Sequence, residues 1–203
     1  MNHIIDLLKR LKAVSLAGRH GVSLSAQAIR NALMGRPIDF KITHSFLFEA
    51  FDKFGNLKWR EVIEANLVVN TGLDDILDKY YKGSAYTAAH YCGLTDGTPT
   101  VAAGDTMASH AGWTEVTAYD EANRPSITWG SVSGQSVDNS ASKATFTISA
   151  NDTTIGGGFV TTDNTKGGST GTLVGGAAFS GGDKVLDDDD TLNVTTTATA
   201  SAS

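Results

Sequence analysis

The chain has 203 residues, of which 40% are hydrophobic and 19% charged, and 16 Lys and Arg against 22 Asp and Glu give a net charge of −6. This composition excludes a disordered chain, which combines low hydrophobicity with high net charge, and the length suits one or two domains. Cys92 is the single cysteine, so no internal disulfide can form. The sequence lacks a membrane-spanning apolar run and the apolar core of a signal peptide, so we expect a protein that folds in a cytoplasm.

Charge and glycine content divide the chain near Gly83. Residues 1–82 hold 12 Lys and Arg against 9 Asp and Glu, whereas residues 83–203 hold 4 against 13. An asymmetry of this kind indicates two structural roles within one chain. We therefore predict a helical N-terminal arm at 1–37, a mixed α/β connecting region at 38–82, and a β-sandwich domain at 83–203.

The first residues have the pattern of an amphipathic helix. Apolar residues recur at helical spacing, and basic residues lie between them. The residues that we expect to dock this arm onto a partner are Ile4, Leu7, Leu8, Lys9, Arg10, Leu11 and Lys12. A second helix is predicted at 24–34, because Ser23 can cap its start while Gly35 and Pro37 end it.

The connecting region mixes both kinds of element. Apolar and polar side chains alternate at 38–44, which predicts an extended segment before an aromatic-rich stretch at 46–51. A turn is expected at 52–56, the stretch 57–69 is ambiguous, and residues 73–81 have the pattern of a short helix. We therefore interpret this region as a connection rather than as a domain.

The C-terminal part has the composition of an all-β domain. It contains 22 threonines and repeated glycine clusters, and these residues favour strands and the turns between them. The predicted strands are 87–94, 114–118, 126–129, 133–137, 143–149, 154–162, 172–174 and 192–199. Many short strands of this kind indicate a mainly β fold, namely an antiparallel β-sandwich that is jelly-roll-like.

The candidate chemical motifs are incomplete. Asp187 to Asp190 form an acidic run, but the ligand spacing of an EF-hand loop is missing, so we expect a solvated turn. His90 and Cys92 lie two residues apart on a predicted strand, yet no second pair completes a zinc site. The sequence has neither a Gly-x-Ser-x-Gly motif nor a phosphate loop. We therefore expect no enzymatic activity, no cofactor and no metal ion.

Large apolar side chains mark the expected core of the β domain. We predict that residues 103–113 form an ordered loop with one helical turn at 106–110 and with Met107 and Trp113 as its apolar anchors. Trp113 and Trp129 are expected to pack between sheets, as large aromatic residues do in sandwich cores. An alternative hypothesis assigns Trp113, Tyr119 and Trp129 to the stacking of sugars.

Several sequence runs carry a resemblance to known proteins. They are Asn66-Leu-Val-Val-Asn-Thr-Gly-Leu73, Tyr91-Cys-Gly-Leu-Thr-Asp96, the more specific Ala103-Gly-Asp-Thr-Met-Ala-Ser-His-Ala-Gly-Trp-Thr-Glu115, Tyr119, Arg124-Pro125, Asn139-Ser-Ala-Ser142, Phe146, Ile155-Gly-Gly-Gly-Phe159 and Asp190-Thr-Leu-Asn-Val194. Through these runs the chain resembles a widespread group of structural proteins of tailed bacteriophages. The resemblance implies a component of a virus particle and leaves its position in the particle open.

The resemblance leads to expectations about function and partners. We expect a non-enzymatic virion protein, assembled in the bacterial cytoplasm, that acts as a capsid decoration (cement) protein. Its arm would dock on the major capsid protein or another virion protein, and it would form a homo-oligomer because repeated shell sites favour symmetric partners. We expect neither nucleic acid nor membrane as a partner. The alternatives are a neck, collar or tail adaptor, a short fibre, and an adhesin that binds host glycans.

Overall fold

The computed structural model describes residues 40–64, 66–86 and 89–202. The chain divides into two compact units, of which the larger, Ile42–Ser201, contains the sheets and the site described below. The predicted arm at 1–37, its helix at 24–34, and the predicted docking residues lie outside the described residues. Those predictions therefore stay predictions.

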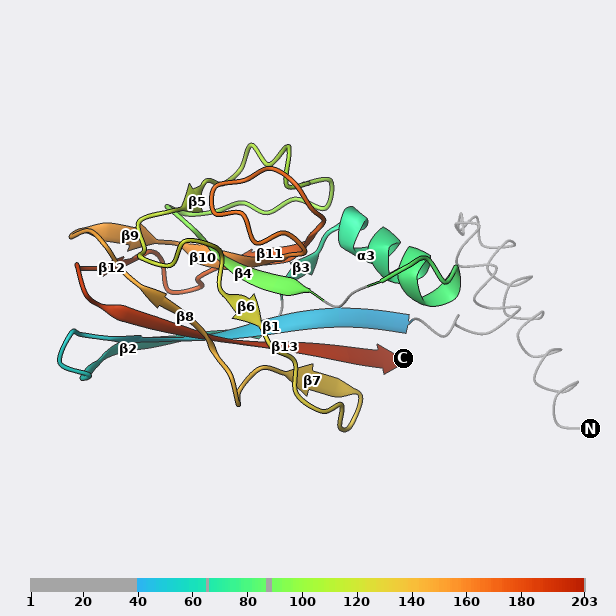
Figure 1. Ribbon diagram of the computed structural model, residues 1–203, viewed down its shortest axis with the longest axis horizontal. Helices are drawn as coiled ribbons and strands as arrows, with labels where there is room; N and C mark the ends of the chain where they lie inside the picture. The colour runs from blue at the N-terminus through green and yellow to red at the C-terminus, as the bar shows by residue number, and fades with distance from the viewer. Residues whose placement is uncertain (1–39, 65, 87–88, 203) are drawn as a thin grey trace, which may run out of the picture. The chain divides into compact units, whose positions relative to one another are not determined.

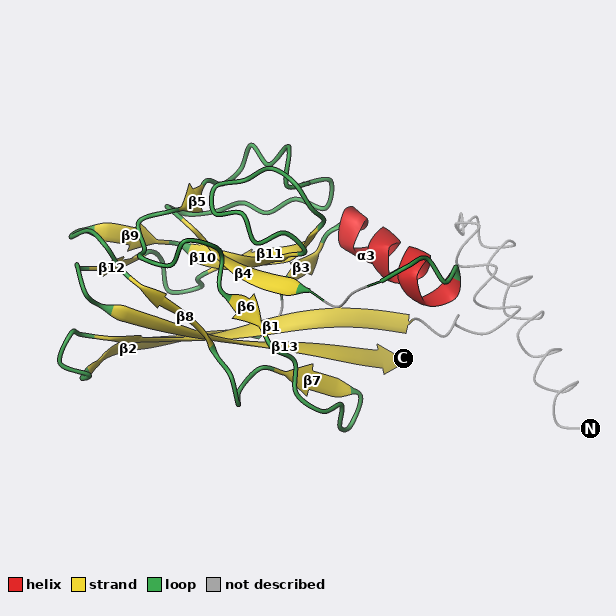
Figure 2. Ribbon diagram, viewed as in Figure 1, coloured by secondary structure: helices red, strands yellow, loops and turns green. Residues whose placement is uncertain are grey.

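The described chain is mainly β, and its strand pairs with known register are antiparallel (Figures 1 and 2). One sheet contains β1 (Phe40–Phe51), β2 (Leu57–Ile63), β7 (Ser136–Asp138), β8 (Ala144–Thr147) and β13 (Thr191–Ala202). Its strand order is β2-β1-β13-β7, and β8 also pairs with β13. The last strand therefore lies beside the first.

A second sheet faces the first in a sandwich-like arrangement (Figure 2). It contains β3 (Leu67–Val68), β4 (His90–Thr95), β5 (Glu115–Val116), β6 (Ser126–Ile127), β10 (Gly157–Thr161) and β11 (Leu173–Ala178). A two-stranded sheet is made of β9 (Thr153–Ile155) and β12 (Lys184–Leu186). The short helix α3 (Asn70–Ile76) follows β3 and continues directly into the π-helix η1 (Leu77–Tyr81).

The main core lies between the two large sheets. Along β1 the side chains of His44, Phe46, Phe48 and Ala50 are buried, and the residues between them are more exposed. This alternation follows from the pleat, which points every second side chain to the same face. Each buried Phe contributes about 1.5–3 kcal/mol to stability. The same alternation places His44 on the core side of the sheet.

A smaller core supports the loop between β4 and β5. Met107 and Trp113, the predicted anchors of this loop, are buried against Phe159 and Leu173. Phe159 fits because a Cβ at Gly93 would lie 2.1 Å from its ring, so glycine leaves the space that the ring occupies. The single helical turn predicted at 106–110 is wrong: residues 106 and 109 instead pair in an antiparallel bridge around a tight turn.

The predicted boundary at Gly83 differs from the observed organisation. β1 and β2 belong to the same sheet as β13, and β3 pairs with β11, so residues 40–68 supply strands to the sandwich instead of connecting an arm to it. The predicted strand at 154–162 is two strands separated by Gly156, and β12 was not predicted at all. The predicted helix at 73–81 is present but begins earlier, at Asn70.

Candidate functional site

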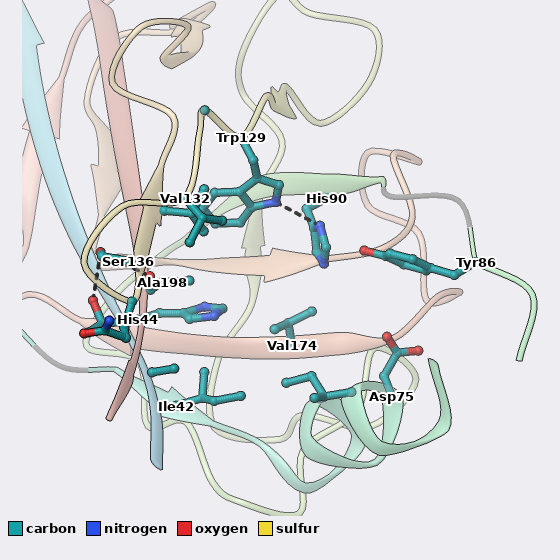
Figure 3. A pocket seen from close by; sticks show the side chains of 17 residues that line it. Ile42, His44, Asp75, Tyr86, His90, Trp129, Val132, Ser136, Val174 and Ala198 are labelled. Carbon is teal, nitrogen blue, oxygen red and sulfur yellow. Dashed lines mark hydrogen bonds between the residues drawn. The ribbon is translucent and has the colours of Figure 1, made fainter. Parts of the chain in front are cut away.

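One end of the sandwich contains a cavity of about 560 Å³, here called the hollow (Figure 3). Its walls come from the start of β1, the end of β13, α3, β7, β11 and the segments beside β4 and β6. The side chains that line it include His44, Asp75, Tyr86, His90, Trp129 and Ala198. Of the described residues that line it, Asp75 alone carries a formal charge at neutral pH.

His44 reaches the hollow from β1. Its backbone is held by a reciprocal pair of hydrogen bonds, since its N–H donates to Asn66 Oδ1 (3.2 Å) and its carbonyl accepts from the Asn66 N–H (2.8 Å). The side chain is 5% exposed, and its ring meets Trp129 edge-on with 6.5 Å between centroids. Its Nδ1 atom is buried and has no hydrogen-bond partner among the described residues. His44 is thus a buried polar group that is only partly satisfied.

His90 reaches the hollow from β4 and is oriented by Trp129 (Figure 3). The Trp129 Nε1–H donates a hydrogen bond of 3.0 Å to His90 Nδ1. Because this nitrogen accepts, the neutral ring carries its hydrogen on Nε2, where it can donate. Protonation of His90 would put a hydrogen on Nδ1 and oppose the indole N–H. The bond therefore favours the neutral form of His90.

Burial keeps both imidazoles uncharged at neutral pH. It lowers the pKa of His44 to about 4, with a smaller contribution from nearby His90. Burial also lowers the pKa of His90, although the Asp75 carboxylate opposes this shift. Burial raises the pKa of the Tyr86 hydroxyl, and Asp75 adds to the effect. The hollow is consequently a mostly apolar space with neutral hydrogen-bonding groups and one carboxylate.

The lowered pKa of His44 predicts a loss of stability in acid. Because the folded pKa lies below the unfolded value of 6.5, the unfolded chain binds more protons once the pH falls below 6.5. We expect His44 to cost the fold about 2–3 kcal/mol between pH 7 and pH 4.5, on the basis of about 1.4 kcal/mol per pKa unit. Urea unfolding at both pH values, in the parent and in His44→Phe, measures this difference. An equal pH dependence in the two proteins would contradict the prediction.

A second surface feature lies on the helical segment. Leu73, Leu77, Tyr80 and Tyr81 are spaced so that they share one side of α3 and η1, and we call them the α3–η1 face. All four are exposed, Tyr80 to 81% and Leu77 to 55%. Gly72 and Asp75, in contrast, line the hollow. An apolar row facing solvent is typical of a protein–protein contact, in which Tyr is enriched.

The aromatic residues proposed for sugar stacking are not arranged for it. Trp113 and Tyr119 are buried, the latter against Phe146, so neither presents a ring face to solvent. Trp129 packs against the main core and lines the hollow. The stacking hypothesis therefore loses two of its three aromatic residues.

The acidic run from Asp187 to Asp190 differs from the solvated turn that the sequence predicts. Asp190 is 3% exposed, and its carboxylate accepts hydrogen bonds from Lys58 Nζ (2.6 Å) and from the Asp187 N–H (2.8 Å). Lys58 Nζ also lies 3.1 Å from Asp187 Oδ2. The run is thus partly a buried ion pair that joins β2 to the turn before β13, and only partly a solvated turn.

Sequence reasoning did not find the hollow. His44 belongs to the predicted extended segment at 38–44, and the sequence pattern favours ordinary packing over metal binding for His90 and Cys92, of which Cys92 is fully buried in the core. Within the described parts of the chain, no group of three His, Cys, Asp or Glu residues is placed to hold a metal ion. None of the described helices has the length and apolarity needed to cross a membrane.

The sequence matches no protein-family model, and a search of curated proteins finds no relative.

Proposed function

We propose that this protein is a non-enzymatic structural component of a tailed-phage particle, and specifically a capsid decoration (cement) protein. In this proposal it assembles in the bacterial cytoplasm, binds the major capsid protein or another virion protein, and forms a homo-oligomer. The support from the sequence is the set of runs that resemble phage structural proteins, above all residues 103–115. We also propose that the sandwich is of jelly-roll type, because β13 returns to lie beside β1 as in Greek-key connections.

The observation that carries the proposal is the α3–η1 face. Two leucines and two tyrosines are exposed along a helical segment of twelve residues. Tyr80 and Tyr81 also pack edge-on against each other, with 5.2 Å between ring centroids, so the pair forms a broad aromatic surface. Aromatic side chains on such a surface supply much of the binding energy when a partner buries them. A protein that assembles into a shell needs a surface of this kind.

Replacement of this face should weaken particle attachment. We expect the variant Leu77→Ser/Tyr80→Ser to bind purified particles with at least about tenfold lower affinity, and so with lower occupancy near the parent's Kd, because loss of a central aromatic contact costs about 2 kcal/mol or more. Val185→Ser removes an exposed apolar side chain from β12 and is the matched control, for which we expect parental occupancy. Co-sedimentation with particles lacking the protein measures both variants. Parental occupancy of the double variant would remove the main support for the proposal.

The predicted arm is tested in the same assay. Leu7→Ser/Leu11→Ser in the full chain should reduce occupancy if the arm docks on the shell, and Ser15→Ala is its control in the same segment. Quantitative mass spectrometry of intact particles then separates decoration from the neck, collar or tail alternative. Hundreds of copies per particle support decoration, whereas a dozen or fewer indicate a ring, an adaptor or a fibre.

A further inference from the structure

We propose that the hollow binds a small, neutral and largely apolar molecule that carries one hydroxyl or carbonyl group. The site is distinct from the α3–η1 face, because α3 turns Gly72 and Asp75 towards the hollow and Leu73 towards solvent. It is also independent of particle attachment, so either proposal can fail alone. Three properties of the hollow lead to this class of ligand.

The first property is size and surface. A cavity of about 560 Å³ lies within the range of about 300–1,000 Å³ that holds drug-sized ligands. Ile42, Val174, Ala198 and the Trp129 ring provide apolar walls on several sides, as Figure 3 shows. A ligand with several hydroxyl groups, such as a sugar, would leave most of them unpaired against these walls. The walls therefore favour a molecule with an apolar body.

The second property is the hydrogen-bonding capacity that remains. His44 lines the hollow and is 5% exposed, but its Nδ1 atom is enclosed by the protein without a partner among the described residues, so a ligand in the hollow meets the ring through its Nε2 edge. His90 Nδ1 is already occupied by Trp129, which leaves its Nε2–H as a donor. Figure 3 shows both rings directed into the hollow. A hydroxyl can donate to one imidazole and accept from the other, and a carbonyl can accept from either.

The third property is charge. The described lining contains no Lys or Arg, and its one formal charge is the Asp75 carboxylate. A carboxylate or phosphate on the ligand would be buried without a cation and would be repelled by Asp75. Both histidines are neutral near pH 7, so neither supplies a positive charge that would pair with an anionic ligand. The hollow therefore selects against anionic ligands such as fatty acids.

The test compares 1-naphthol with naphthalene, which has the same ring system without the hydroxyl. Calorimetry on the full chain should show one site for each compound, with 1-naphthol about fivefold to tenfold tighter, the ratio given by one net hydrogen bond of about 1–1.4 kcal/mol. His44→Phe keeps an aromatic ring but leaves the His90 Nε2–H as a donor, so it should lower this ratio below the parent value, and an unchanged ratio would show that His44 does not bind the hydroxyl. Equal affinities in the parent protein would overturn the assignment of the polar group.

Two variants locate the binding. Ala198→Phe fills the hollow and should abolish binding of both compounds, whereas Ala122→Phe, on an exposed loop, should leave binding unchanged. If Ala198→Phe fails to fold, amide chemical shifts in the parent protein give the same answer. Addition of 1-naphthol should then move the resonances of Val174 and Ala198 and leave those of Val185 in place. Absence of saturable binding, or shifts confined to residues outside the hollow, would overturn the proposal.

Discussion

Arg124→Met should destabilise the fold by about 3–5 kcal/mol, the cost of breaking a buried ion pair from one side. The Arg124 side chain is fully buried, and its guanidinium donates to both carboxylate oxygens of Glu115 at 2.8 and 2.7 Å. It also donates to the carbonyl oxygens of Asp163 (3.0 Å) and Gly168 (2.7 Å). Methionine fills part of the space and satisfies none of these acceptors. Urea unfolding at pH 7 measures the loss.

The control for this prediction is an exposed ion pair in the same fold. Lys143 Nζ lies 2.6 Å from Glu49 Oε2, but Lys143 is 36% exposed, so Lys143→Met should cost less than about 1 kcal/mol. The double variant Arg124→Met/Glu115→Leu should recover part of the loss, because it removes the carboxylate that Arg124→Met leaves buried without a cation. A loss below about 1 kcal/mol in Arg124→Met would show that Arg124 is not a structural anchor.

Arg124 also shows why the sequence predicts the fold class better than it predicts the side-chain contacts within the fold. Its guanidinium joins β5, through Glu115, to the loop that holds Asp163 and Gly168, and it lies 5.4 Å from the centre of the Phe159 ring. Glu115 is nine residues before Arg124 in the chain, whereas Asp163 and Gly168 are 39 and 44 residues after it. Local sequence patterns contain no information about contacts of Arg124 with distant residues. The sequence therefore identifies Arg124 only as part of one of the runs that carry the resemblance.

The strands that were predicted well are those with a strong local pattern. The alternation at 38–44 and the aromatic stretch at 46–51 together correspond to β1, and the predicted turn at 52–56 is present. In that turn Asp52 Oδ1 accepts hydrogen bonds from the backbone N–H groups of Phe54 and Asn56, and Gly55 has a positive φ of 84°. Residues next to each other in sequence are sufficient to specify these features.

The features that were missed depend on distant partners. β1 belongs to the sandwich because it pairs with β13 near the other end of the chain, and its charge and composition do not reveal this pairing. β12 has three residues and an exposed Val185 at its centre, so it carries no alternation that a sequence pattern can detect. The hollow is assembled from many separate segments, and its two histidines come from β1 and β4 in opposite sheets. Only the assembled fold brings them together.

Trp113→Ala should cost about 3–5 kcal/mol, the range for removing a buried aromatic side chain. The indole packs on Phe159 with 4.9 Å between ring centroids and stacks on His110 at 3.7 Å. Its Nε1–H donates to Asp105 Oδ2 (3.1 Å), an atom that also accepts the Ala102 N–H (2.9 Å). The variant thus leaves a cavity and removes one partner of a carboxylate that is 9% exposed.

Two further variants separate packing from hydrogen bonding at this position. Trp113→Phe keeps an aromatic ring but loses the donor to Asp105, so we expect an intermediate loss of about 1–3 kcal/mol. His110→Ala removes the stacked ring from the partly exposed side and should have the smallest effect. Thermal melts rank the three, since each 1 kcal/mol shifts Tm by roughly 2–4 °C in a chain of this length. If Trp113→Ala melts with the parent protein while His110→Ala loses a measurable binding activity, the loop at 103–113 is a functional site and its role as a structural anchor is wrong.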